Sequence, residues 1–249
     1  MSSPVVLITG ALAGIGRATA FAYAKDGARV VVSGRNEEVG AKLVRELRAT
    51  GAEAEFVRAD VRHEEDVKNL VDKTVARFGR LDIAVNNAGT EGVAGSAADV
   101  TTENYKAIFD TNVLGVLLSM KYEIRAMLPQ GKGSIVNISS AYGKVGGPGA
   151  AIYVGSKHAV EGITKSAAIE LAGTGVRVNI VGPGPVETGM FNRFAQTKEN
   201  KAAFLETYVP NKRIGTPEEI ADAIVFIGSD KASYIIGASL AVDGGMIAG

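Results

Sequence analysis

Two side chains with complementary acid and base character, Tyr153 and Lys157, stand four residues apart. The surrounding segment is rich in helix formers, and residues four apart emerge on one face of a helix. A free tyrosine has a pKa of about 10, but a neighbouring ammonium stabilises the phenolate and lowers that pKa. The pair is a candidate acid–base unit, although this spacing alone favours two exposed side chains on an amphipathic helix.

A serine hydroxyl before the Tyr153–Lys157 pair favours a catalytic role of the pair over an exposed position on a helix. Ser140 lies thirteen residues before Tyr153, and Ser139 is its rival for the same role. In a carbonyl reduction, Tyr153 would protonate the oxygen of the developing alkoxide, and a serine would hydrogen-bond the same oxygen. In the reverse oxidation the tyrosine would act as the base.

A glycine-rich turn supplies a second kind of chemistry. The first apolar run, Val5 to Thr9, leads directly into Gly10, Gly14 and Gly16, and a helix-forming stretch begins at Arg17. A strand whose last residues open a helix through glycines lets backbone N–H groups approach a pyrophosphate, and the helix dipole favours its negative charge. Three residues separate Gly10 from Gly14, which departs from the general G-x-G-x-x-G spacing.

The elements that must position these residues alternate along the chain. Seven short β-branched runs are predicted to be strands, and the inner ones are continuously apolar, as expected for parallel strands covered on both faces. Between them lie segments long enough for crossover helices. A single-domain, doubly wound α/β fold over residues 1–249 follows, with a seven-stranded parallel sheet and helices on both faces. The predicted strands are Val5–Thr9, Arg29–Ser33, Glu53–Val57, Leu81–Asn86, Ser134–Ile138, Val176–Val181 and Ser239–Asp243.

The bulk composition excludes several classes of protein. Lys plus Arg and Asp plus Glu both total 27, which leaves no net charge to attract nucleic acid or anionic lipid. The chain has no cysteine, which removes disulfides, thiolate zinc sites and cysteine nucleophiles. The first apolar run is too short for a signal sequence, and no stretch approaches the roughly 18 apolar residues of a spanning helix. A cytoplasmic location is expected, with no nucleic-acid or membrane partner.

The glycine turn and five further segments together resemble the short-chain dehydrogenase/reductase family over nearly the whole chain. Thr9–Gly16 matches the Thr-Gly-x-x-x-Gly-Ile-Gly cofactor motif of that family. The other segments agree with the family in order and spacing: Asp60, Asn86–Gly89, the set Asn112, Ser140, Tyr153 and Lys157, Pro183–Thr188, and Val242–Gly245. The resemblance implies a Rossmann-like fold and an NAD(P)-dependent oxidoreductase acting on a carbonyl or secondary alcohol.

The resemblance assigns four catalytic residues. Tyr153 would be the general acid and base, and the family's interval to the tyrosine selects Ser140 rather than Ser139. The resemblance also implies that Lys157 binds the hydroxyls of the nicotinamide ribose. Asn112, on an earlier helix, would hold a water in a proton relay.

The resemblance also implies a set of cofactor contacts. Asp60 is expected at the adenine, Asn87 in support of the cofactor loop, and Pro183–Thr188 on the nicotinamide side. The full expected set is Gly10, Leu12, Gly14, Ile15, Gly16, Arg35, Asp60, Val61, Asn87, Ala88, Gly89, Tyr153, Lys157, Pro183, Gly184, Val186 and Thr188.

The residues after the second predicted strand favour NADP over NAD. Ser33–Asn36 contains no acidic residue that could accept hydrogen bonds from the adenosine ribose, and Arg35 is suited to pair with a 2′-phosphate. Against this, Ala13 stands where many NADP-using relatives carry a basic residue, so NAD stays open.

Residues 187–211 form the least strand-like part of the chain and are predicted to be a substrate lid. Aromatic and apolar side chains stand there among charged ones, and the segment follows the expected nicotinamide-side loop. An apolar-leaning carbonyl compound is the expected substrate. These side chains are Met190, Phe191, Phe194, Phe204, Leu205 and Tyr208.

Two other functions remain open beside the oxidoreductase. One is a dinucleotide-binding regulator that turns nothing over, and the other is an isomerase or lyase that keeps its cofactor bound. The two histidines, His63 and His158, are not a credible metal pair, and no metal site is predicted. The family resemblance further implies a homotetramer.

Overall fold

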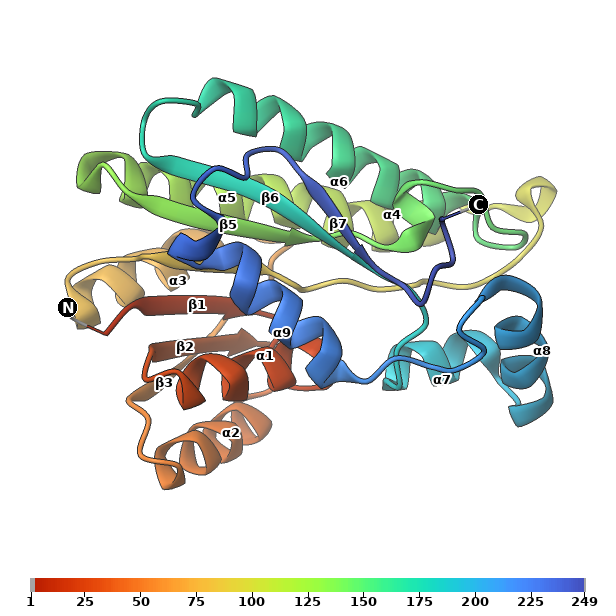
Figure 1. Ribbon diagram of the computed structural model, residues 1–249, viewed down its shortest axis with the longest axis horizontal. Coiled ribbons are helices and arrows are strands. Elements are labelled where there is room, and N and C mark those ends of the chain that lie inside the picture. The colour runs from red at the N-terminus through yellow and green to blue at the C-terminus, as the bar shows by residue number, and fades with distance from the viewer. Residues whose placement is uncertain (1–2, 249) are drawn as a thin grey trace.

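The centre of the protein is one parallel sheet of seven strands, seen in a computed structural model that describes residues 3–248 (Figure 1). Its strand order is β3-β2-β1-β4-β5-β6-β7, so the order reverses between β1 and β4. This confirms the predicted doubly wound sheet. The strand bounds are β1 (Val5–Thr9), β2 (Arg29–Gly34), β3 (Ala54–Arg58), β4 (Ile83–Asn86), β5 (Gly133–Ile138), β6 (Val176–Pro183) and β7 (Ser239–Val242).

All seven predicted strands are present, with small shifts at their ends. The largest shift at a strand start is at β4, which begins at Ile83 rather than at Leu81. The side chain of Gln130 explains it, because its amide accepts a hydrogen bond from the Leu81 N–H at 3.0 Å and donates one to the Leu81 carbonyl at 2.7 Å. The backbone of Leu81 is therefore satisfied by a side chain instead of a neighbouring strand.

Helices cover both faces of the sheet, as predicted (Figure 1). Helices α1, α2 and α9 lie on one face, and α3 to α6 lie on the other, while α7 and α8 stand apart beyond the end of the sheet. Their bounds are α1 (Gly14–Lys25), α2 (Glu37–Ala49), α3 (Glu64–Phe78), α4 (Thr102–Phe109), α5 (Gly115–Met127), α6 (Ala151–Glu170), α7 (Gly189–Ala195), α8 (Lys198–Tyr208) and α9 (Pro217–Gly228).

The strands are apolar on both sides because they separate two hydrophobic cores. Along β1, Val6 and Ile8 pack with the α1, α2 and α9 side, whereas Val5 and Leu7 pack with the α3, α5 and α6 side. Alternate residues of a strand point to opposite faces. A continuous apolar run is therefore the signature of a strand buried between two helical layers.

A polar network is buried between the middle strands and the helices α5 and α6. The Asn86 side-chain N–H₂ donates to the Glu123 carboxyl at 3.0 Å and to the Asn137 amide oxygen at 2.9 Å, and Asn137 donates to the Thr164 hydroxyl at 2.9 Å. Glu123 is only 1% exposed, and burial raises its pKa to about 8. At neutral pH this carboxyl therefore keeps its proton.

The buried carboxyl generates a prediction on stability. Between pH 4.5 and 8 the unfolded chain releases a proton that folded Glu123 retains, so the free energy of unfolding falls as pH rises and this loss is complete above about pH 8. Glu123→Gln has no such proton, so its free energy of unfolding does not fall for this reason. The free energy of unfolding of the variant minus that of the wild type should therefore increase by roughly 2–4 kcal/mol between pH 5 and pH 9. Urea unfolding at both pH values measures the difference.

The exposed carboxyl of Glu170, at the end of α6, provides the control. Glu170→Gln should keep the pH profile of the wild type. Parallel pH profiles for Glu123→Gln and the wild type would contradict the assignment.

Candidate active site

The site lies where the strand order reverses, since the loops that leave β1 and β4 diverge there and open a cleft. The side chain of Asn87, just after β4, bridges this point. Its N–H₂ group donates to the carbonyl of Thr9 at 3.1 Å and to the carbonyl of Gly10 at 2.9 Å. Asn87 thus holds the glycine-rich turn against the other half of the sheet.

Two glycines of this turn are required by its geometry. Gly10 has a φ of +63°, and a β-carbon on it would lie 2.7 Å from the Cα of Ala88. A β-carbon on Gly16 would lie 2.5 Å from the Gly10 carbonyl oxygen and 2.5 Å from the Asn87 amide nitrogen. The turn therefore folds back tightly onto itself, onto Ala88 and onto Asn87.

The N-terminus of α1 is left open for an anion. Its N-cap residue, Ala13, makes no side-chain cap, and no acidic residue stands in the first turn. By contrast, α2, α3 and α9 all carry two or more carboxylates in their first turns, and α9 also has a capping box at Thr216. Unpaired N–H groups and an uncompensated dipole at α1 fit the phosphates of a dinucleotide.

A cavity of about 530 Å³ opens at the carboxyl ends of the strands. Three of the four predicted catalytic residues line it: Ser140, Tyr153 and Lys157. Several predicted cofactor residues also line it, from the glycine turn, the β4 loop and the β6 loop. These are Ile15, Asn87, Gly89, Pro183, Gly184, Val186 and Thr188.

The two adjacent serines have different surroundings. The Ser139 hydroxyl donates to the Lys157 carbonyl at 3.3 Å and is buried. The Ser140 hydroxyl accepts from the Tyr142 N–H at 3.2 Å, and its proximity to the Tyr153 phenol lowers the pKa of that phenol. Both serines line the cavity, but Ser140 is the one whose hydroxyl acts on the Tyr153 phenol.

Lys157 is held by the sheet. Its ammonium is buried and donates to the Ile138 carbonyl, the last of β5, at 2.9 Å. The Nζ lies 5.6 Å from the centroid of the Tyr153 ring. Burial disfavours the charged form and lowers the pKa of Lys157 to about 8.

The pKa of Tyr153 differs from the expectation that a neighbouring ammonium would lower it. Burial dominates and raises the pKa to about 12, while the hydrogen bond with Ser140 acts in the opposite direction. The negative charges of Glu91 and ionised Tyr142 raise it further. In this state the phenol is held in its protonated form at neutral pH, ready to donate a proton.

Asn112 does not line the cavity, although it lies directly behind it. It sits in a π-helical turn, Asp110–Leu114, between α4 and α5, and is 1% exposed. Its amide accepts from the Thr90 N–H at 2.8 Å and donates to the Thr90 carbonyl at 2.9 Å and to the Ser156 hydroxyl at 3.1 Å. The side chain thus anchors the β4 loop to α6, and π-helical turns often occur at functional sites.

The predicted adenine-side residues lie outside this cavity. Asp60 forms an ion pair with Arg62 at 2.5 Å. The hydrogen bonds from Arg62 lower the pKa of Asp60 to about 2, and the positive charge of Arg35 also lowers it. Arg35 itself is exposed at the end of β2. Leu12 packs against Gly34, and Val61 packs against Gly115. Leu12 and Val61 therefore each pack against another segment of the protein itself.

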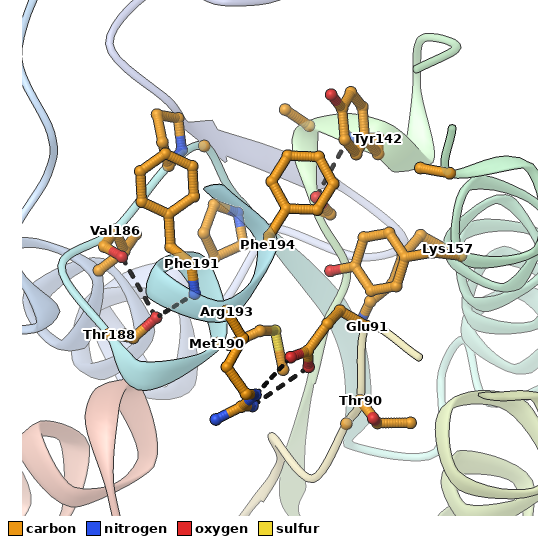
Figure 2. A pocket seen from close by; sticks show the side chains of 18 of the residues that line it. Thr90, Glu91, Tyr142, Lys157, Val186, Thr188, Met190, Phe191, Arg193 and Phe194 are labelled. Carbon is orange, nitrogen blue, oxygen red and sulfur yellow. Dashed lines mark hydrogen bonds and ion pairs between the residues drawn. The ribbon is translucent and has the colours of Figure 1, made fainter. Parts of the chain in front are cut away.

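The predicted lid, residues 187–211, consists of α7 and α8 with their connections. Aromatic side chains join the two helices and face the cavity (Figure 2). Phe191 and Phe204 have ring centroids 5.6 Å apart, and Phe194 lies 6.0 Å from Phe204 and 6.4 Å from Tyr142. Met190 also lines the cavity, whereas Leu205 and Tyr208 are not among the lining residues.

Several lining residues had no signal in the sequence, among them Glu91, Tyr142 and Met246. Tyr142 follows Ser140 by two residues and packs edge-on against Tyr153, with centroids 6.4 Å apart. Glu91 and Met246 come from the β4 loop and the segment after β7, and no local pattern marks either position. Only the fold brings them to the cavity.

Within the described residues, 3–248, no group of three or more metal-type ligands comes together, and the metal prediction stays a prediction. The helices of that same stretch include none with the length and hydropathy to cross a bilayer.

Comparisons with known proteins agree with this architecture. A family model described as enoyl-(acyl carrier protein) reductase matches residues 10–247. The chain is 43% identical to a 2,5-dichloro-2,5-cyclohexadiene-1,4-diol dehydrogenase of Sphingobium indicum, covering 100% of this chain and 98% of the relative. It is 40% identical to a cyclohexanol dehydrogenase of an Acinetobacter species, covering 98% of this chain and 94% of the relative.

A solved structure gives the same picture. A single-site variant of actinorhodin polyketide ketoreductase, solved with NADPH, superposes with a TM-score of 0.93 at 38% identity, covering 98% of this chain and 97% of that one. With the family model and the relatives, this likeness shows that the chain belongs to the short-chain dehydrogenase/reductase family of NAD(P)-dependent oxidoreductases.

Proposed function

We propose that the protein is an NADP-preferring oxidoreductase that interconverts an uncharged cyclic ketone and its secondary alcohol. The observation that carries this proposal is the cavity of about 530 Å³, which combines aromatic walls with hydroxyl donors at its base. Tyr142, Phe191 and Phe194 supply a flat apolar surface, while Ser140 and Tyr153 supply the O–H groups. Such a pocket suits an apolar ring that carries one reactive oxygen.

Two relatives support the choice of a ring-shaped substrate. Both the Sphingobium and the Acinetobacter dehydrogenases are named for six-membered carbocyclic alcohols. Each shares at least 40% of its residues with this chain over nearly its full length.

The residues present fit a nicotinamide dinucleotide. The uncapped N-terminus of α1 and the tight glycine turn would receive the pyrophosphate, and Asp60 and Val61 would border the adenine. Pro183–Thr188 would border the nicotinamide, and Lys157 would bind its ribose. When bound, the reduced cofactor supplies the hydride for the carbonyl carbon.

The chain's own residues handle the proton. Tyr153 donates its phenol proton to the carbonyl oxygen as that oxygen gains negative charge, and Ser140 donates a second hydrogen bond to the same atom. Because burial keeps the phenol protonated, reduction needs no prior change of state at Tyr153. Lys157 holds α6 against β5, and Asn112 fixes the loop that borders the cavity.

The central experiment removes the phenol oxygen alone. Tyr153→Phe should lower kcat for cyclohexanone reduction by about 10²–10⁴-fold, since the acid is lost, while NADPH binding changes little. Absorbance of the reduced nicotinamide measures turnover, and a cofactor titration measures binding. Tyr142→Phe, a hydroxyl lost from the same cavity, should stay within about tenfold of the wild type.

The outcomes separate the alternatives. Wild-type turnover in Tyr153→Phe would remove the acid role of this residue. Binding of NADPH without turnover of any ketone would favour a dinucleotide-binding regulator. Turnover that returns the cofactor unchanged would identify an isomerase or lyase.

The preference for NADP rests on Arg35. Arg35 is exposed at the end of β2, close enough for its charge to act on Asp60, and no acidic residue follows β2 at the ribose position. Arg35→Ala should lower kcat/KM for NADPH by about 10–100-fold, because a contact with the 2′-phosphate is lost. The kcat/KM for NADH should change by less than about threefold, because NADH lacks that phosphate. Arg45→Ala, an exposed arginine on α2, is the control. An equal loss of kcat/KM with NADPH and NADH would contradict a role of Arg35 in binding the 2′-phosphate.

A homotetramer is also proposed, with residues 1–249 of each chain as one domain. Exposed apolar side chains fall into two groups, which we assign to two faces of the assembly: one from α4 to the start of α5, and one at the end of α6, on α9 and before β7. A location in the cytoplasm stays a prediction from the sequence. The exposed residues are Tyr105, Leu114 and Leu117 on the first face, and Ile169, Phe226, Tyr234 and Ile236 on the second.

The mass of the particle in solution tests the assembly. Light scattering should give four copies of the 25.8 kDa chain, and Leu117→Lys or Tyr234→Lys should each yield dimers, because a charge opposes burial of one face. Val39→Lys is the control, because it also introduces a charge at an exposed apolar residue, but on α2. It should leave the tetramer intact. A monomeric wild type would refute the proposal.

A further inference from the structure

Charged side chains are rare in the cavity. Among its lining residues in the described part of the chain, only Glu91, Lys157 and Arg193 carry a charge. Lys157 is bonded to the Ile138 carbonyl at the base. The other two lie opposite each other at the lid, and Figure 2 shows them joined by two hydrogen bonds.

The Glu91–Arg193 pair connects two parts of the fold that are far apart in sequence. Glu91 follows β4 and Arg193 lies on α7. The guanidinium binds the carboxylate in bidentate fashion, with Nε to Oε1 at 2.6 Å and Nη2 to Oε2 at 3.2 Å. Planar bidentate pairs of this kind fix orientation as well as distance.

The two partners are unequally exposed. The Glu91 side chain is 12% exposed, whereas that of Arg193 is 67% exposed. Water therefore screens the guanidinium well and the carboxylate poorly. Although the pair is formally neutral, its contribution to the potential inside the cavity is then dominated by the negative partner.

This field reaches the reacting end of the cavity. The charge of Glu91 is one of the causes that raise the pKa of Tyr153. A substrate anion seated beside the Tyr153 phenol would therefore be exposed to the repulsion of Glu91. A neutral substrate of the same shape would not.

We propose that Glu91 selects substrate by charge, so that the enzyme accepts uncharged cyclic ketones and alcohols and disfavours those carrying a carboxylate or phosphate. This inference rests on the proposed function and adds a specificity-determining residue to it. The geometry that carries it is a shielded carboxylate on the cavity wall whose cationic partner is largely exposed to solvent.

The test compares two ketones that differ only in charge: 4-oxocyclohexanecarboxamide and 4-oxocyclohexanecarboxylate at pH 7. The measured quantity is the ratio of kcat/KM for the carboxylate to that for the carboxamide. In the wild type this ratio should be below about 0.1. Glu91→Gln keeps the shape and removes the charge, and it should raise the ratio by about tenfold or more.

Two further variants separate charge from lid movement. Arg193→Gln leaves Glu91 unpaired, so the ratio should fall further, by about threefold or more. Glu187→Gln breaks another ion pair of the lid, that with Lys201 at 2.7 Å, without changing the charge of the cavity lining. It should leave the ratio unchanged even if it alters turnover of both ketones.

The results distinguish this inference from the proposed function. If the wild type reduces the carboxamide but Glu91→Gln leaves the ratio within about twofold, charge selection by Glu91 is refuted and the oxidoreductase proposal stands. If Glu187→Gln shifts the ratio as much as Glu91→Gln does, the effect belongs to the lid and the inference also fails. If the wild type reduces neither ketone, the proposed substrate class and this inference both fail.

Discussion

The buried ammonium of Lys157 is the constraint on which the geometry of the site depends. A charge removed from water needs a polar partner, and the Ile138 carbonyl supplies it at the end of β5. That bond fixes the register of α6 on the sheet. One helical turn earlier, Tyr153 then faces the cavity, and the chain leaving β5 brings Ser140 to the same place. The positions of three side chains thus follow from one buried hydrogen bond.

Burial also decides the protonation states within this arrangement. It raises the pKa of Tyr153 to about 12 and lowers that of Lys157 to about 8, so both groups are shifted toward their neutral forms. An apolar cavity with neutral hydroxyl donors responds most strongly to charge that appears during a reaction. Under the proposed function, that charge develops on the carbonyl oxygen between Tyr153 and Ser140.

Local patterns in the sequence predict most of the fold, because an inner strand buried on both faces must be apolar throughout, and all seven predicted runs form strands. They fail where distant residues interact. The start of β4 depends on Gln130, 49 residues after Leu81, and Glu91 meets Arg193 across 102 residues. Spacing likewise placed Tyr153 and Lys157 on one helix face but carried no information on the depth of burial, which sets the pKa of the tyrosine.

The attachment of the lid differs from that of the other helices. None of the residues of α8 is buried, and it is joined to α7 and the segment before it by aromatic rings and by the bonds of Lys201 to Asn192 and Glu187. The sheet and its two cores involve neither helix. Insertions, deletions and substitutions in this segment can therefore accumulate at little cost to folding. Over evolutionary time, descendants of such a protein can acquire new substrates while the inherited chemistry stays unchanged.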